Sequence, residues 1–262
     1  MKELLTRTLS GAVLVAVIVF CVLFSTWSMA VLSMVIIVVG TYEMGRLQHI
    51  EDKWLLIVVE LIVVGFFLSY LVYGALKLVF VMAPFLLALF SKKYDFKTIA
   101  AFVFGSMAYL GLPCAFMVVM HTSPFSNMGP NMVLLVFVLL WANDTFAYLT
   151  GRLLGKHKLF ERISPGKTIE GSIGGLVLTM VGIIIFSRCV DWLSLKTAIG
   201  MGLIAVVFGT LGDLCESMLK RQAGVKDSGN LIPGHGGILD RFDSVLFAIP
   251  FVYVFLLLML WV

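Results

Sequence analysis

The chain is a succession of long apolar runs, and this feature restricts it to folds that face lipid. Runs long enough to cross about 30 Å of hydrocarbon as helices fall at 9–25, 28–46, 54–73, 77–90, 98–120, 131–151, 172–190, 197–214 and 243–262. Only 13% of the residues are charged, against about 25% in soluble domains. Since backbone polar groups in lipid must be satisfied within the segment, we predict an all-α polytopic integral membrane helical bundle with about nine transmembrane helices, a single domain over residues 1–262.

The basic residues are distributed unevenly over the connections between these runs. If the N-terminus is cytoplasmic, 16 of the 19 Lys and Arg residues lie in cytoplasmic connections, and only Lys77, Arg188 and Lys196 lie outside. Cytoplasmic loops of membrane proteins are enriched in Lys and Arg. We therefore predict a cytoplasmic N-terminus, with the long polar connections 151–171 and 215–242 on the cytoplasmic side.

Four acidic residues fall within the predicted spans, where a carboxylate costs on the order of 2.5–3.5 kcal/mol and marks a candidate functional site. Glu43 and Glu60 stand alone, and we expect them to be interfacial or hydrogen-bonded. Asp144 and Asp213 each lead into one of the long polar connections. The predicted catalytic region is therefore built from about 141–175 and 213–244.

The first of these segments reads WANDTFAYLTGRLLGKHKLFERISPGKTIEGSIGG. Its basic residues suit anchoring to anionic lipid or phosphate binding. SPGKT is not a phosphate-binding P-loop, because position 161 is Glu where that motif needs Gly. We expect instead a Ser-Pro-Gly turn that presents Lys167 beside the next helix as an anion site. The Gly151/Gly155 and Gly171/Gly175 pairs are typical of close helix packing.

The second segment carries acidic residues at two helix ends. On a helix, Asp213, Ser217 and Lys220 share one face, and Asp240 and Asp243 are close enough to converge. Oxygen ligands of this kind suit a hard cation such as Mg²⁺, with nearby basic residues as phosphate partners. The alternative is that Asp240 and Asp243 only cap and stabilise the last helix. The metal hypothesis requires Asp213 to lie close to the other two.

The stretch SMLKRQAGVKDSGNLIPGHGGILDRFD (217–243) resembles the signature of phosphatidate cytidylyltransferases (CDP-diacylglycerol synthases). The matching pattern is Ser, one residue, an aliphatic, Lys-Arg, four residues, Lys-Asp, then Pro-x-His-Gly-Gly and Asp-Arg-x-Asp. NDTFAYLTGRLLGKHKL and ISPGKTIEGSIGG resemble a second block of that family. The resemblance implies an integral membrane enzyme that joins CTP and phosphatidic acid to give CDP-diacylglycerol and pyrophosphate.

The resemblance also implies Mg²⁺ as cofactor, with a second cation such as K⁺, and a homodimer in contact with membrane lipids. It implies that Asp213, Asp240 and Asp243 bind the metal, and that the catalytic set also includes Lys220, Arg221, Lys226 and Asp227. It implies that Asn143, Asp144, Ser164, Lys167 and Arg241 bind the substrates, and the residues themselves add Ser217, from its helix face, and His235, from its turn, to this set. For His235, donation to a phosphate and capping of its turn both stay open. We expect no nucleic-acid partner.

Two other functions fit parts of the pattern. A cation transporter also carries acidic residues in its spans, but here the polar residues gather at one membrane face and no matched pair of broken helices is visible. A CTP-dependent lipid kinase would release CDP instead of pyrophosphate. The short N-terminus and compact length favour a bacterial inner membrane, with the active site on the cytoplasmic side.

Overall fold

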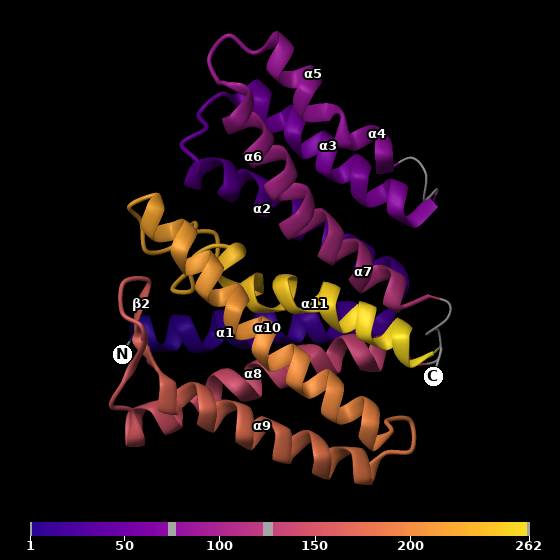
Figure 1. The fold of residues 1–262 in the computed structure, drawn as a ribbon, viewed down its shortest axis with the longest axis vertical. Helices are drawn as coiled ribbons and strands as arrows, with labels where there is room; N and C mark the ends of the chain where they lie inside the picture. The colour runs from indigo at the N-terminus through magenta and orange to yellow at the C-terminus, as the bar shows by residue number, and fades with distance from the viewer. Residues whose placement is uncertain (1, 73–76, 123–127, 261–262) are drawn as a thin grey trace.

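The structure of the protein is a computed structural model that describes residues 2–72, 77–122 and 128–260. It is a helical bundle (Figure 1), and the described residues include eight helical segments long and apolar enough to cross a membrane. The helices are α1 Lys2–Phe24, α2 Thr26–Leu47, α3 Lys53–Val72, α4 Lys77–Val81, α5 Ala83–Phe90, α6 Phe96–Ser106, α7 Leu112–Met120, α8 Gly129–Leu154, α9 Ile169–Cys189, α10 Leu195–Gln222 and α11 Leu239–Met259. The predicted polytopic helical fold is thus confirmed. The predicted spans 54–73 and 243–262 end at residues outside the described part.

The fourth predicted span, 77–90, is where the structure differs from the expected nine helices. Two short helices, α4 and α5, replace one long helix. The chain turns at Met82, and Pro84, which has no N–H to donate, lies in the first turn of α5. The apolar helical stretch Val79–Phe90 is shorter than a full span. The pair nevertheless leads from the end of the bundle where α3 stops to the end where α6 begins (Figure 1).

Helices α6 and α7 form one continuous span, Phe96–Met120. They are joined by a π-helical turn at Met107–Gly111. Pro113 lies in the first turn of α7. The sequence-based range 98–120 agrees closely with this segment.

Both long polar connections are shorter than predicted, because the flanking helices continue past the apolar runs. α8 ends at Leu154, and α10 ends at Gln222, eight residues after the predicted 214. Strands β1 (Lys158–Phe160) and β2 (Ser164–Thr168) form an antiparallel hairpin, with Lys158 opposite Thr168. The expectation of a Ser-Pro-Gly turn was therefore wrong: 164–166 belong to β2, and the turn precedes them.

Helices α8, α9 and α10 lie together on one side of the bundle, with α11 along α10 (Figure 1). Glycines allow α8 and α9 to approach closely. A Cβ at Gly171 would lie 2.8 Å from the Ala147 carbonyl oxygen, and one at Gly175 would lie 2.7 Å from Asn143 Oδ1. This confirms the predicted packing role of these glycines.

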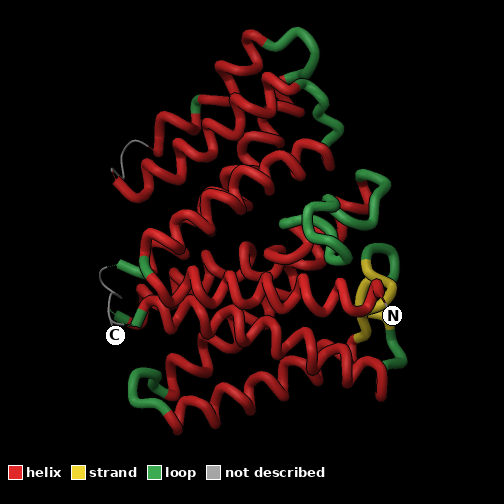
Figure 2. Tube along the Cα trace, turned by 180° about the vertical axis from the view of Figure 1, so that it is seen from behind, coloured by secondary structure: helices red, strands yellow, loops and turns green. Residues whose placement is uncertain are grey.

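The two polar connections lie at the same end of the bundle. Figure 2 shows the strands and the loop before α11 near the start of α1, while α11 ends at the opposite end. Residues far apart in the sequence, by as much as 225 positions for Ser10 and His235, are thereby brought to one mouth, which positions the candidate site.

Candidate functional site

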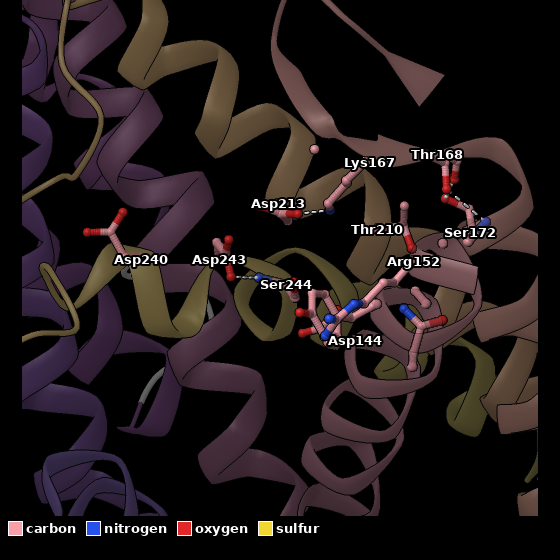
Figure 3. A pocket seen from close by; sticks show the side chains of 16 residues that line it. Asp144, Arg152, Lys167, Thr168, Ser172, Thr210, Asp213, Asp240, Asp243 and Ser244 are labelled. Carbon is pink, nitrogen blue, oxygen red and sulfur yellow. Dashed lines mark hydrogen bonds and ion pairs between the residues drawn. The ribbon is translucent and has the colours of Figure 1, made fainter. Parts of the chain in front are cut away.

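A polar cavity of about 430 Å³ opens at this end of the bundle, between α8, β2, α9, α10 and α11 (Figure 3). This volume is within the range of small-molecule sites. Its lining includes Asn143, Asp144, Arg152, Lys167, Thr168, Ser172, Asp213, Asp240, Asp243 and Ser244. The structure thus brings together predicted residues from both polar segments.

Three carboxylates converge beside this cavity, and two of them, Asp213 and Asp243, line it. Asp213 and Glu216 on α10 and Asp243 on α11 each offer an oxygen, and these oxygens lie within 4.8 Å of one another. The requirement that Asp213 lie close to α11 is therefore met for Asp243. Three carboxylate oxygens at this spacing suit a hard divalent cation, which takes carboxylates together with substrate phosphates.

Glu216 is the most buried member of this group. Its side chain is 1% exposed and contacts the Lys220 ammonium group as an ion pair without hydrogen-bond geometry. Neither of its carboxylate oxygens accepts a hydrogen bond within the described part of the chain. Since a buried charge needs more compensation than one such contact, the Glu216 carboxylate fits a site that holds a cation.

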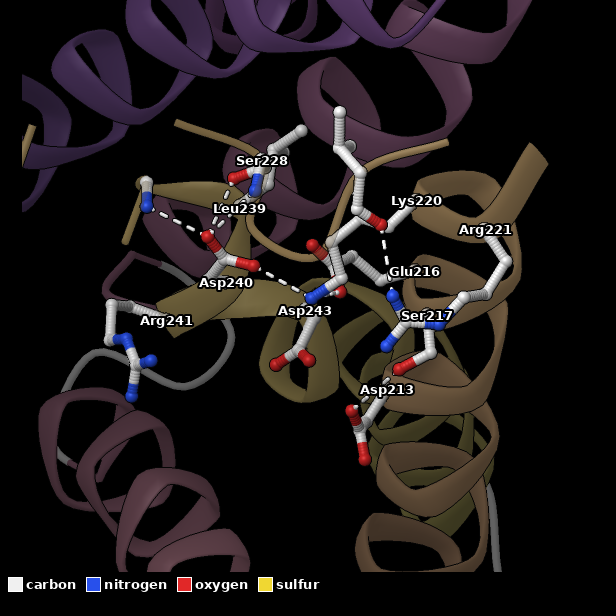
Figure 4. A network of polar contacts seen from close by, with 12 residues as sticks. Asp213, Glu216, Ser217, Lys220, Arg221, Ser228, Leu239, Asp240, Arg241 and Asp243 are labelled. Atoms are coloured by element: carbon white, nitrogen blue, oxygen red, sulfur yellow. Dashed lines mark hydrogen bonds and ion pairs between the residues drawn. The ribbon is translucent and has the colours of Figure 1, made fainter. Parts of the chain in front are cut away.

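The Asp240 carboxylate has different surroundings (Figure 4). Its Oδ1 accepts a 2.7 Å hydrogen bond from Lys220 Nζ. Its Oδ2 accepts from the backbone N–H groups of Ser228 and Gly237, at 2.9 and 2.7 Å, and from the Ser228 hydroxyl at 3.0 Å. Asp240 therefore organises the loop before α11, and a cation bound to it would share this carboxylate with Lys220. It does not cap α11, whose N-cap position is Ile238.

Glu43 supplies the cap that α11 needs. Its side chain on α2 is buried, and its two oxygens accept from the backbone N–H groups of Ile238 and Leu239 at 3.0 and 2.9 Å. The Ser228 hydroxyl oxygen also lies 2.8 Å from Glu43 Oε2, so its single proton goes either to Glu43 or to Asp240. The prediction that Glu43 is hydrogen-bonded is thus confirmed, and its effect is to fix the start of α11 against α2.

The glycines before α11 allow these carboxylates to approach the backbone. Gly236 has a φ of +79°, and a Cβ there would lie 2.5 Å from Asp240 Oδ2. A Cβ at Gly237 would lie 2.4 Å from a Glu43 oxygen. Side chains at both positions would therefore displace Asp240 or Glu43.

Lys167 reaches the acidic group from β2 and forms an ion pair with Asp213 (Figure 3). Burial lowers the pKa of Lys167 below its usual range. Ser217, on the same face of α10, donates a 3.4 Å hydrogen bond to Asp213. The predicted helix face of Asp213, Ser217 and Lys220 is thus present.

Asn143 and Asp144 follow each other on α8 but differ in exposure. The Asn143 amide is buried, and its Oδ1 has no hydrogen-bond partner among the described residues. Asp144 is exposed at the cavity wall. Both line the cavity from α8.

Several predicted residues lie outside this cavity. The Arg221 side chain donates to the carbonyl groups of Ile163 and Val225, which ties α10 to both polar connections. Ser164 on β2 and the exposed Lys226 and Asp227 in the loop after α10 are also outside the lining, as are Ser217, Lys220, His235 and Arg241.

His235 and Arg241 lie on the other side of the first turn of α11. His235 Nδ1 is 2.8 Å from the Ser10 hydroxyl of α1. Arg241 Nε donates a 2.8 Å hydrogen bond to the His235 carbonyl oxygen. In Figure 4 the Arg241 guanidinium and the Asp240 carboxylate point in different directions.

Glu216 and Glu43 contribute to the site, but the sequence did not lead us to predict a role for either of them there. Glu216 lies three positions after Asp213 on the same helix. The i, i+3 rule that paired Asp240 with Asp243 therefore applied to it equally. The partnership of Glu43 with α11 has no comparable signal, because 195 positions separate it from Ile238.

Comparison with known proteins shows which proteins this chain is similar to. Three curated relatives are named phosphatidate cytidylyltransferase. Those of Staphylococcus saprophyticus and Staphylococcus aureus are 45% and 46% identical to this chain over 159 residues, which is 60% of this chain and 59% of each relative. That of Staphylococcus haemolyticus is 45% identical over 161 residues, 61% of this chain and 60% of the relative. The matched region thus spans about three fifths of each relative.

A family model extends this likeness over nearly the whole chain. The model of the cytidylyltransferase family matches residues 5–259, which include both polar segments and all the helices that line the cavity. The chain belongs to the cytidylyltransferase family.

Proposed function

We propose that this protein is a phosphatidate cytidylyltransferase, which transfers the cytidylyl group of CTP to phosphatidic acid. The observation that carries the proposal is the convergence of Asp213, Glu216 and Asp243 beside Lys167 at one end of a lipid-facing bundle. Acidic residues for a cation and basic residues for phosphates are both required by nucleotidyl transfer. The family membership and the names of the relatives support the same reaction.

The divalent cation that we propose is Mg²⁺, held by Asp213, Glu216 and Asp243. The second carboxylate oxygen of Glu216, Oε1, has no partner among the described residues, and this supports the ligand set. Asp240 is a further candidate ligand, as the resemblance implies, and a second cation such as K⁺ is part of the same proposal. When bound, Mg²⁺ would neutralise charge on the phosphates of CTP and on the departing pyrophosphate.

The reaction forms one bond and breaks one. A phosphate oxygen of phosphatidic acid attacks the α-phosphorus of CTP in line with the leaving group. The bond between the α-phosphorus and the bridging oxygen breaks, and pyrophosphate leaves with the electron pair. Since the second pKa of a phosphate monoester is near 6, the attacking group is mostly a dianion at neutral pH and needs no strong general base.

The residues of the cavity would therefore act by position and charge. Two anions that repel each other must be held in line, and fixed cations lower the cost of bringing them together. Lys167 and Arg152 line the cavity from β2 and α8, and we assign them to the phosphates of CTP. Lys220 holds Asp240 and Glu216 in place.

We also propose that the mouth of the cavity faces the cytoplasm of a bacterial inner membrane. The uneven distribution of Lys and Arg supports this orientation, and soluble CTP is present on that side. The acyl chains of phosphatidic acid would stay in the bilayer. The homodimer is a further part of the proposal and rests on the family resemblance.

The test is to incubate the purified protein in detergent micelles with CTP, Mg²⁺ and phosphatidic acid, and to follow both products. We expect lipid-linked cytidine and pyrophosphate in equal amounts, and neither after chelation of the metal. Release of CDP with a phosphorylated lipid would assign the protein to the lipid kinases. Cation flux into sealed vesicles without CTP would favour a transporter.

A further inference from the structure

A second cavity of about 230 Å³ adjoins the first, between α1, α8 and α11. The two cavities share four lining residues: Asp144, Asp240, Asp243 and Ser244. The first turn of α11 and one position of α8 thus border both cavities. Two ligands that occupied these cavities would face the same carboxylates from different sides.

We infer that this second cavity binds the phosphate headgroup of the lipid substrate, while the first binds the nucleotide. The inference rests on the proposed function, since it divides that site between its two substrates. It assigns Arg241 and His235 to the lipid phosphate. It also gives α1 a role, because Ser10 positions the His235 ring.

The cations of the second cavity suit a phosphate monoester. Arg241 uses Nε to donate to the His235 carbonyl oxygen. Its two terminal nitrogens have no partner among the described residues, and they lie at the end of the guanidinium group that can bind phosphate in a bidentate manner. The Arg241 guanidinium is therefore held in place through Nε, and its two terminal nitrogens are available to a ligand.

Ser10 determines which nitrogen of His235 faces the cavity. The Ser10 hydroxyl oxygen lies 2.8 Å from His235 Nδ1, 3.0 Å from the Pro233 carbonyl oxygen and 3.1 Å from the Arg7 carbonyl oxygen. A carbonyl oxygen only accepts, and the hydroxyl has one proton. When that proton goes to a carbonyl oxygen, His235 Nδ1 must be the donor to Ser10. In the neutral ring Nε2 then carries no proton. His235 can therefore donate from Nε2 to a phosphate oxygen when Ser10 instead donates to Nδ1, or when both ring nitrogens are protonated.

The remaining walls of this cavity are apolar and continue towards lipid. Leu14 and Ile18 of α1 face Phe137 and Trp141 of α8 across it. Leu14 also lines an apolar groove of about 520 Å³ between α1 and residues 231–233. A lipid with its phosphate at Arg241 would therefore find apolar surface for its acyl chains, which a nucleotide does not need.

Gly11 provides a test of this assignment away from the carboxylates. A Cβ at position 11 would lie 3.3 Å from His235 Nε2, so Gly11→Val would narrow the cavity where the phosphate is placed. Gly105→Val is the matched control, because a Cβ there would meet nothing within 4 Å. Ser10→Ala is a milder second variant that removes only the hydroxyl.

The experiment measures lipid binding and turnover separately. Wild type and variants are placed in phosphatidylcholine nanodiscs that contain phosphatidic acid or, as a control without phosphate, diacylglycerol. Retention of each labelled lipid is measured without CTP. Apparent KM values for phosphatidic acid and CTP are then measured in micelles. Binding of a non-hydrolysable CTP analogue shows that each variant is folded.

We expect Gly11→Val to raise the apparent KM for phosphatidic acid about tenfold, or about 1.4 kcal/mol, and to leave analogue binding and the KM for CTP within about twofold. Ser10→Ala should raise the apparent KM for phosphatidic acid by less than Gly11→Val does. Gly105→Val should leave the KM values for phosphatidic acid and CTP unchanged. Equal shifts in both KM values, or unchanged lipid retention in Gly11→Val, would overturn the assignment. Displacement of phosphatidic acid by pyrophosphate alone would also overturn it, because the cavity would then belong to the nucleotide phosphates.

These outcomes also separate this inference from the proposed function. Suppose that wild type binds phosphatidic acid more tightly than Gly11→Val does, but makes no lipid-linked cytidine. The lipid site would then be supported and the proposed reaction refuted. If wild type makes lipid-linked cytidine and Gly11→Val binds phosphatidic acid as wild type does, the proposed reaction would be supported and the lipid site refuted.

Discussion

Lys220 Nζ lies 2.7 Å from Asp240 Oδ1 and also contacts Glu216, so one ammonium group joins the last turns of α10 to the first turn of α11. The Lys220 side chain is 11% exposed and that of Asp240 is 4% exposed. Two residues of the signature, twenty positions apart, thus neutralise each other inside the site.

The first prediction concerns the coupling of this pair. Lys220→Met should destabilise the protein by about 3–5 kcal/mol, since it leaves buried carboxylates without their cation. The double variant Lys220→Met with Asp240→Asn should lose less than the sum of the two single variants. Unfolding by denaturant in detergent micelles measures the three values. Additive losses would mean that the contact contributes no net coupling.

The second prediction separates the roles of two aspartates in the same turn of α11. Asp243→Asn and Glu216→Gln should each weaken binding of Mn²⁺, used as a spectroscopic substitute for Mg²⁺, by about tenfold or more, because each removes a charged oxygen ligand. Asp240→Asn should instead lower stability, because its Oδ2 accepts from Ser228 and Gly237.

Titration of free Mn²⁺ by electron paramagnetic resonance gives the affinities, with wild type as reference. An Asp240→Asn variant that loses as much Mn²⁺ affinity as Asp243→Asn would make Asp240 a ligand. Full Mn²⁺ affinity in Glu216→Gln would remove Glu216 from the ligand set.

Much of this arrangement was predictable from sequence, for physical reasons. Long apolar runs and the distribution of Lys and Arg indicate helices and their order, and the carboxylates before and after one loop indicate a shared site. The features that could not be predicted from the sequence depend on contacts between segments that are far apart in the chain. The start of α11 depends on Glu43 of α2, and the ring of His235 depends on Ser10 of α1. The division into two cavities follows from where α1 packs, which no local pattern specifies.

The third prediction concerns the cap that Glu43 provides. Glu43→Ala should cost about 2–5 kcal/mol, because it leaves the buried N–H groups of Ile238 and Leu239 without an acceptor. Glu60→Ala is the matched control, since Glu60 lies on α3 away from the site. Thermal unfolding in detergent measures both. A smaller loss for Glu43→Ala than for Glu60→Ala would contradict the capping role.

The fourth prediction uses two glycines of α9 that differ only in their surroundings. Gly175→Val should destabilise the protein by about 1–3 kcal/mol through overpacking, since a Cβ there would meet Asn143 and Ala147 of α8. Gly182→Val should have little effect, because a Cβ at Gly182 meets nothing within 4 Å. The change should also reduce activity in Gly175→Val, because the cavity lies between these helices. Equal stability of the two variants would exclude close α8–α9 packing at this point.

The fifth prediction concerns pH. His121, at the end of α7, is buried, and its Nε2 has no hydrogen-bond partner among the described residues. Burial lowers the pKa of His121 below its usual range, so the unfolded chain, with an ordinary histidine pKa near 6.5, binds the proton more readily. The free energy of unfolding should therefore be fully retained above about pH 7.5 and should fall as the pH drops through 6.5. His121→Gln should remove this slope. Unfolding midpoints from pH 5.5 to 8 measure it, and an identical slope in wild type and His121→Gln would show that other groups cause the acid sensitivity.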